Sequence, residues 1–295
     1  MKLIGFILTD NYIAGLLISN ACLIVSCIYL YKLAKLDADD ASALRSIKYL
    51  LLFPVSFILS GVFTESLYLM LVLMCFYYAR TDRWHLAGGL GFFLALTRSL
   101  GVLIVLPLLY EGLQPLFSKG VSLKNLKSLT NLISFRNDLI PILSRLSYLL
   151  LIPLGLAVFM AYNYYLTGDF LAFAHAQAAW GRHFGSPLLT LLDAFDSNIN
   201  SKFEAVFAAV SLSVFLLFYN RIRVSYWIFG IYSMLVPLFT GIMSMPRFIL
   251  VIFPIYILLA DLTEKRVSEE IAILSLALLQ GCLMVFWSNG FNLII

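Results

Sequence analysis

Charged residues are scarce in this chain of 295 residues. Only 12% of the residues are charged and 62% are apolar, whereas an ordinary soluble domain has roughly 25% charged residues. Twenty Lys and Arg with sixteen Asp and Glu cannot cover the surface of a soluble globule of this size. The shortage excludes a soluble Rossmann or barrel enzyme. The net charge of +4 is spread over short loops, which excludes a nucleic-acid binder with one basic patch.

Cysteine is also rare. The four cysteines lie inside apolar stretches, and none stands in a Cys-x-x-Cys pair or at metal-ligand spacing from a histidine. A disulfide scaffold is therefore excluded, and the four are expected to be small packed hydrophobes. The sequence has no clear internal repeat and no Gly- or Ser-rich linker, so we expect one membrane domain over residues 1–295.

Apolar runs are what the sequence has in quantity. They are long enough to cross about 30 Å of hydrocarbon, and they predict an all-α, polytopic bundle of about ten transmembrane helices. We expect spans near residues 12–31, 46–62, 65–80, 85–98, 100–117, 147–166, 203–219, 224–241, 247–262 and 271–289.

The basic residues give an independent test of orientation. If residue 1 starts on the non-cytoplasmic side, fifteen of the twenty Lys and Arg fall in cytoplasmic connections, as the positive-inside rule requires. Both termini are therefore expected to be non-cytoplasmic. The five basic residues on the non-cytoplasmic side are then Lys2, Arg98, Arg182, Lys202 and Arg247.

Two loops are long enough to have a role of their own. The loop over 118–146 is basic and expected to be cytoplasmic. Its leucines at every third residue predict a helix that lies in the headgroup plane, with a plain anchoring connector as the alternative. The loop over 167–202 is expected on the other side. It contains two of the three histidines, a tryptophan and several carboxylates, and we expect a functional site there.

Three further charges stand where lipid makes charge costly. Glu65, Arg98 and Arg247 each lie between two apolar runs, and a charge at the centre of a membrane helix costs roughly 2.5–3.5 kcal/mol. All three fall on the predicted non-cytoplasmic side, together with the loop that contains Asp169 and Arg182. Such charges indicate a functional site. The alternative is that Glu65 pairs with Arg98 or Arg247 and simply holds helix ends together.

The residue types on this side suit a lipid that carries both a phosphate and a sugar. Arginine binds phosphate bidentately, while Trp and Gln suit a sugar through ring stacking and amide hydrogen bonds. Trp180 has the alternative role of an aromatic anchor at the membrane interface. The candidate substrate-binding residues are Arg98, His175, Gln177, Trp180, Arg182 and Arg247.

Four motifs in this order are similar to those of one known family. They are Phe53-Pro54 to Thr64-Glu65-Ser66, Leu96 to Gly101, Ala172-Phe173 to Arg182, and Ser244 to Phe248 with Phe253-Pro254. Together they resemble the second mannosyltransferase of GPI-anchor assembly and its prokaryotic relatives, over residues 13–262. The resemblance implies a GT-C fold. It also implies transfer of a hexose, here mannose, from a polyprenyl-phosphate donor to a lipid or glycan acceptor on the non-cytoplasmic face.

The resemblance has one departure. Members of that family have an Asp-containing luminal loop after a first span, which is thought to supply the catalytic base, and residue 1 of this chain lies past that point. We therefore expect a chain that is truncated or starts late, a partner subunit that supplies this region, or a protein without catalysis. If the chain is an enzyme, Glu65 and Asp169 are the candidate catalytic carboxylates, to orient the acceptor or to serve as base.

The sequence also bears on cofactors, on the membrane in which the protein lies and on other possible functions. No cofactor is predicted, although Asp193 and Asp196 leave a divalent ion open. The short loops and the late start favour a prokaryotic plasma membrane over the endoplasmic reticulum. The rivals are a transporter or flippase of a lipid-linked sugar and a non-catalytic subunit of a transferase. Charges that cluster on one face, with no evident repeat, favour the transferase over the transporter.

Overall fold

The computed structural model describes residues 10–118, 140–179 and 181–291. This described part of the chain is helical and contains no strand, which confirms the all-α prediction. Most of the predicted interfacial helix over 118–146 lies outside the described residues. The helices before that gap are α2 (Asn11–Ala34), α3 (Asp40–Leu52), α4 (Glu65–Arg80), α5 (Trp84–Thr97) and α6 (Val105–Ser118), with the 3-10 turns η1 (Ser56–Ser60) and η2 (Ser99–Ile104).

The second half continues the same pattern. Its elements are α8 (Leu151–Thr167), α9 (Ala172–Ala179), α10 (Pro187–Asp196), α11 (Ile199–Leu217), η4 (Tyr219–Arg221), α12 (Val224–Leu238), α13 (Met245–Leu250), α14 (Pro254–Leu262) and α15 (Arg266–Ser288).

Helices long and apolar enough to cross a membrane occur at four places in the described residues. They are Asn11–Ala34, Ile140–Thr167, Ile199–Leu217 and Arg266–Ser288. The predicted spans over 65–80 and 85–98 coincide with α4 and α5 to within one residue. At 16 and 14 residues, however, these helices are shorter than the roughly 20 residues that a span needs. A membrane protein is therefore supported, while the count of about ten spans stays a prediction.

Two predicted spans are broken by proline. The run over 247–262 is divided into α13 and α14, and Pro254 is the first residue of the second piece. Proline fixes φ and lacks a backbone N–H, so it begins a helix more readily than it continues one. The run over 46–62 breaks in the same way, because Phe53 takes an extended ψ of 142° before Pro54.

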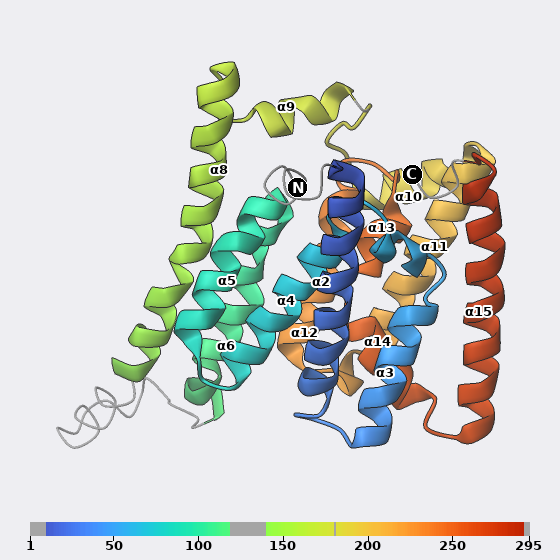
Figure 1. Ribbon diagram of the computed structural model, residues 1–295, viewed down its shortest axis with the longest axis horizontal. Helices are drawn as coiled ribbons and strands as arrows, with labels where there is room; N and C mark the ends of the chain where they lie inside the picture. The colour runs from blue at the N-terminus through green and yellow to red at the C-terminus, as the bar shows by residue number, and fades with distance from the viewer. Residues whose placement is uncertain (1–9, 119–139, 180, 292–295) are drawn as a thin grey trace.

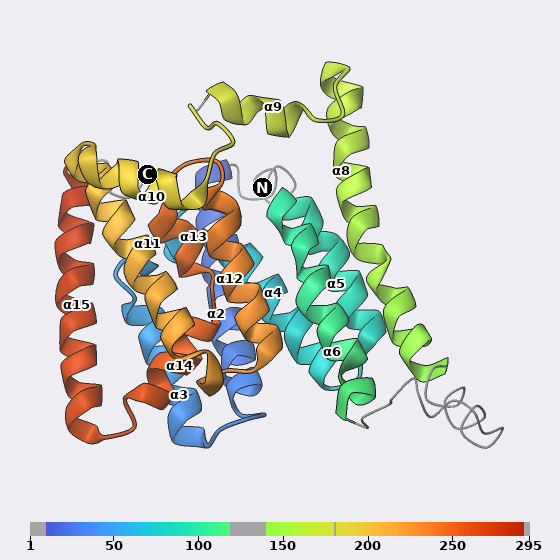
Figure 2. The same cartoon turned by 180° about the vertical axis from the view of Figure 1, so that it is seen from behind.

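The bundle has two distinct ends (Figures 1 and 2). α9 and α10 lie across one end, with α10 near α13, and we call this the α9 end. α3 and α15 begin at the opposite end. Between the ends, α4 packs against both α2 and α5, and α5 packs in turn against α8.

Aromatic rings fill the centre of the bundle where α4, α12 and the break between α13 and α14 meet. Phe76, Tyr226, Phe229 and Phe253 are all buried, and their ring centroids lie 5.0–5.6 Å apart, mostly edge to face. Such pairs add about 0.5–1.5 kcal/mol each beyond the burial of their area. The break between α13 and α14 is therefore fixed against the middle of the bundle.

Ion pairs hold the opposite end together. Arg223 makes two hydrogen bonds to the buried carboxylate of Glu111, at 2.5 and 3.0 Å. Arg80 pairs with Asp37 and donates a hydrogen bond of 2.7 Å to the hydroxyl of Tyr226. These pairs join α6 to α12, and α4 both to the end of α2 and to α12, so these four charged residues have structural partners.

Glycine lets α5 and α8 approach closely. A Cβ at Gly155 of α8 would lie 2.3 Å from the backbone oxygen of Phe92, and one at Gly88 of α5 would lie 2.2 Å from the backbone oxygen of Tyr148. Small residues at crossing points are the usual way in which membrane helices pack. At the end of α8, Gly168 takes a left-handed φ of 75° and turns the chain into α9. The packing of α8 against α5, together with the turn at Gly168, therefore determines where α9 begins.

We expect Gly155→Ala to lower the free energy of unfolding by about 1–3 kcal/mol, since the new methyl group must displace backbone rather than a flexible side chain. Gly89→Ala is the matched control, because a Cβ there meets no heavy atom within 4 Å, and alanine favours a helix over glycine. Thermal unfolding in detergent measures both. Equal loss of stability in the two variants would contradict the close α5–α8 packing.

Candidate functional site

A buried carboxylate is the centre of the α9 end. Glu65 is the first residue of α4, and its side chain is fully buried. Its Oε1 accepts a hydrogen bond of 2.6 Å from Arg98 and two from Arg247, at 2.9 and 2.6 Å. Glu65 thus pairs with both arginines that the sequence offered as alternatives. Its place at a helix N-terminus also favours the negative charge.

Arg98 reaches Glu65 from the junction of α5 and η2. The residue takes an extended conformation between the two elements, and its Nε donates a hydrogen bond of 3.2 Å to the hydroxyl of Thr64. Its guanidinium also lies 5.7 Å from the ring centroid of Tyr68 and 5.9 Å from that of Phe248. The side chain is therefore held by the start of α4 and by α13.

Arg247 reaches Glu65 from the first turn of α13. The helix begins after Ser244, a non-glycine residue with a left-handed φ of 66°. The carbonyl of Ser244 accepts the backbone N–H of Arg247 at 3.0 Å, and the guanidinium of Arg247 lies 4.7 Å from the ring centroid of Phe63. The position of Arg247 therefore depends on the turn at Ser244.

Arg182 approaches from the other side of the same region. Its Nη2 donates a hydrogen bond of 3.0 Å to the carbonyl of Met243, and its guanidinium lies 5.4 Å from the ring centroid of Phe248. Partial burial lowers the pKa of Arg182, although a guanidinium stays protonated in a protein. The described residues offer Arg182 no ion pair within 4.0 Å, so its remaining N–H donors have room for an anion.

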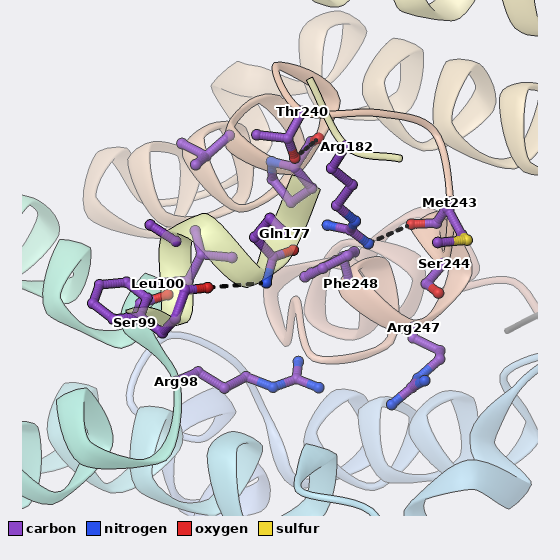
Figure 3. A pocket seen from close by; sticks show the side chains of 14 residues that line it. Arg98, Ser99, Leu100, Gln177, Arg182, Thr240, Met243, Ser244, Arg247 and Phe248 are labelled. Carbon is purple, nitrogen blue, oxygen red and sulfur yellow. Dashed lines mark hydrogen bonds between the residues drawn. The ribbon is translucent and has the colours of Figure 1, made fainter. Parts of the chain in front are cut away.

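A cavity of about 660 Å³ lies among these arginines (Figure 3). In Figure 3, Arg98 and Arg247 extend toward each other below Phe248, while Arg182 lies on its other side. The polar lining is Arg98, Ser99, Gln177, Arg182, Thr240, Ser244 and Arg247, and the apolar lining includes Leu100, Phe173, Val236, Pro237 and Phe248. The site therefore offers cationic donors beside an apolar wall.

The charges at the site leave a positive excess. Three guanidiniums face the cavity, against the carboxylate of Glu65 and a second buried carboxylate, Glu204, which lies behind the lining. With both carboxylates ionised, the cluster has a formal charge of +1. Because the walls contain much apolar surface, an anion that enters gains more from these charges than it does in water.

The other predicted residues of the loop divide into two groups. Gln177 lines the cavity from α9. Asp169 and His175 form an exposed pair, with 2.6 Å between Oδ2 and Nδ1, and neither lines the cavity. The backbone N–H of Leu171 and then the imidazole of His175 lower the pKa of Asp169, so this carboxylate braces the turn before α9. Trp180 lies outside the described residues.

Two buried carboxylates were missed by the sequence predictions. Glu111 and Glu204 are only 7% and 6% exposed, and each is a lone carboxylate inside a predicted apolar span, over 100–117 or 203–219. A charge among apolar residues was the criterion that singled out Glu65, and the same criterion could have found both. Among the described residues, no three His, Cys, Asp or Glu side chains gather as metal ligands, and Asp193 and Asp196 lie exposed on α10.

No family model, no curated protein and no solved structure matches this chain. The resemblance to the mannosyltransferase family therefore rests on the motifs alone.

We expect Glu65→Gln to lower the free energy of unfolding by about 3 kcal/mol, because it leaves two neighbouring guanidiniums without their shared counter-charge. Asp169→Asn is the matched control. Its carboxylate pairs at the exposed surface, and such pairs contribute roughly 0–1 kcal/mol. Thermal unfolding in detergent compares the two. If Glu65→Gln were as stable as Asp169→Asn, Glu65 would not hold the site together.

Proposed function

We propose that this protein is an integral-membrane glycosyltransferase that takes a hexose, mannose by resemblance, from a polyprenyl-phosphate donor. The acceptor is the hydroxyl of a lipid or glycan. The observation that carries the proposal is the cavity at the α9 end, which combines three arginines with an apolar wall. A polyprenyl-phosphate sugar has the same two properties, an anionic group and a long apolar chain.

The phosphate is assigned to the arginines. A guanidinium has five N–H donors in a planar fork that matches phosphate oxygens. Arg98 and Arg247 use part of this capacity on Glu65, while Arg182 donates to the carbonyl of Met243. In the proposal, Arg182 is therefore the residue that contacts the phosphate directly. Arg98 and Arg247 add a positive electrostatic potential beneath it.

The lipid chain and the sugar are assigned to the rest of the cavity. Leu100, Val236 and Pro237 form an apolar side that suits an isoprenoid chain, and Gln177 offers amide hydrogen bonds to sugar hydroxyls. A volume of about 660 Å³ falls in the range of roughly 300–1,000 Å³ that is usual for small-molecule sites. Trp180 stays a candidate sugar contact from the same loop.

The reaction in this proposal inverts the sugar at its anomeric carbon. The acceptor oxygen loses its proton to a base and forms a bond to that carbon, while the bond from the carbon to the phosphate oxygen breaks. The phosphate leaves with the electron pair and its negative charge, which the arginines stabilise. Because Glu65 Oε1 is shared by two guanidiniums, we favour Glu65 as the residue that orients the arginines rather than as the base.

The base and the membrane topology belong to the same proposal. Asp169 stays a candidate base, and a partner subunit with an Asp-containing loop is the alternative source. About ten passes, with the α9 end and both termini on the non-cytoplasmic side, agree with the positive-inside rule. A prokaryotic plasma membrane is the proposed location, and no bound cofactor is invoked.

Arg182→Met is expected to reduce transfer of labelled mannose from a polyprenyl-phosphate donor by about 10- to 100-fold, since a hydrogen bond to a charged group contributes about 1.5–3 kcal/mol. The matched control is Arg221→Met. Arg221 is exposed at the opposite end and pairs with Asp261 at 3.4 Å, so its loss is expected to leave the rate unchanged.

The assay uses the full chain in vesicles with a membrane extract as acceptor source. The assay is run with and without an added membrane fraction that could supply a partner subunit. If the chain binds the donor but no mannose is transferred in either case, the proposal of an enzyme is contradicted, and a flippase or a non-catalytic subunit is favoured. Equal rates for Arg182→Met and Arg221→Met would contradict the assignment of the phosphate.

A further inference from the structure

Glu204 is a buried carboxylate for which the proposed reaction has no use. It lies on the second turn of α11, a helix long and apolar enough to cross a membrane, and only 6% of the residue is exposed. A carboxylate in such a place is costly unless it is paired or hydrogen-bonded. The hydrogen bond that Glu204 accepts therefore indicates what this carboxylate does in α11.

The contact of Glu204 is with the turn before α13. Its Oε1 accepts the backbone N–H of Ser244 at 2.7 Å. Ser244 has a φ of 66°, a left-handed conformation that residues with a Cβ adopt rarely and only where the surroundings hold them. The hydrogen bond that Ser244 donates to Glu204 of α11 is one such restraint.

Two arginines of the cavity depend on this turn. On one side of it, the carbonyl of Met243 accepts the hydrogen bond from Arg182. On the other side, the carbonyl of Ser244 accepts the backbone N–H of Arg247 at 3.0 Å and that of Phe248 at 3.3 Å, which begins α13. The ring of Phe248 then lies against the guanidiniums of both Arg98 and Arg182.

We propose that Glu204 is a positioning residue for the arginine cluster, acting through the left-handed turn at Ser244. It does not line the cavity and has no contact with substrate in this account. The inference rests on the proposed function, because it assigns the turn to the binding of a phosphate-bearing lipid. It adds α11 to the segments that determine the site.

The test is a set of variants of the full chain in nanodiscs, with binding of a polyprenyl phosphate measured against the matching phosphate-free polyprenol. Glu204→Ala is expected to weaken binding of the phosphate at least tenfold. Glu204→Gln keeps an oxygen acceptor for the N–H of Ser244, so its binding is expected to stay within about threefold of the parent. Glu270→Ala, at an exposed carboxylate near the start of α15 at the opposite end, is the control and is expected to bind like the parent.

The left-handed turn gives a second, independent arm. Glycine adopts a positive φ without steric cost, so Ser244→Gly is expected to restore most of the binding lost in Glu204→Ala when the two are combined. Ser244→Val is expected to weaken binding as Glu204→Ala does, because a β-branched residue disfavours this conformation. Because Ser244→Val perturbs the turn without changing Glu204, it keeps the test decisive if Glu204→Ala fails to fold.

Several results would overturn the inference. They are parent-like binding by Glu204→Ala, loss of binding in Glu204→Gln equal to that in Glu204→Ala, or no recovery in the double variant. Failure of the proposed function looks different. In that case the parent chain itself binds the polyprenyl phosphate no better than the polyprenol, and Arg182→Met changes nothing.

Discussion

The rest of the site depends on one buried ion triad. Glu65 joins Arg98, which is 33 residues away in the sequence, to Arg247, which is 182 residues away. Three segments from different parts of the chain therefore meet at a single carboxylate oxygen. Breaking such a group leaves uncompensated buried charge, so the triad constrains how α4, α5 and α13 can sit at the α9 end.

The triad also explains why a cavity with cationic walls can persist there. Two guanidiniums that face one space repel each other, and their shared carboxylate offsets that repulsion. Arg182 is added from the loop before α10, and it is held by the carbonyl of Met243 rather than by a carboxylate. The cluster thus has one cation with free donors, Arg182, above a triad of net charge +1, which is an arrangement that suits capture of a phosphate.

The sequence supports these features unequally. Charged and turn residues mark the ends of α4 and α5, so the apolar runs predict both helices to within one residue. They predict helix lengths less well, because proline breaks such as that at Pro254 occur inside apolar runs. The pairing of Glu65 with an arginine is one of two interpretations that the sequence leaves open, because all three residues fall on the same predicted side of the membrane. Glu204 could have been found by the same criterion, but its partner is a backbone N–H, which no side-chain pattern reveals.

A structure of the full chain bound to a polyprenyl phosphate in nanodiscs, determined by cryo-electron microscopy, would show where the phosphate lies relative to the ion triad. We expect phosphate density within hydrogen-bond distance of the guanidinium of Arg182, with Glu65 still bridging Arg98 and Arg247. Phosphate density away from Arg182, or a Glu65 side chain no longer shared by the two arginines, would contradict it.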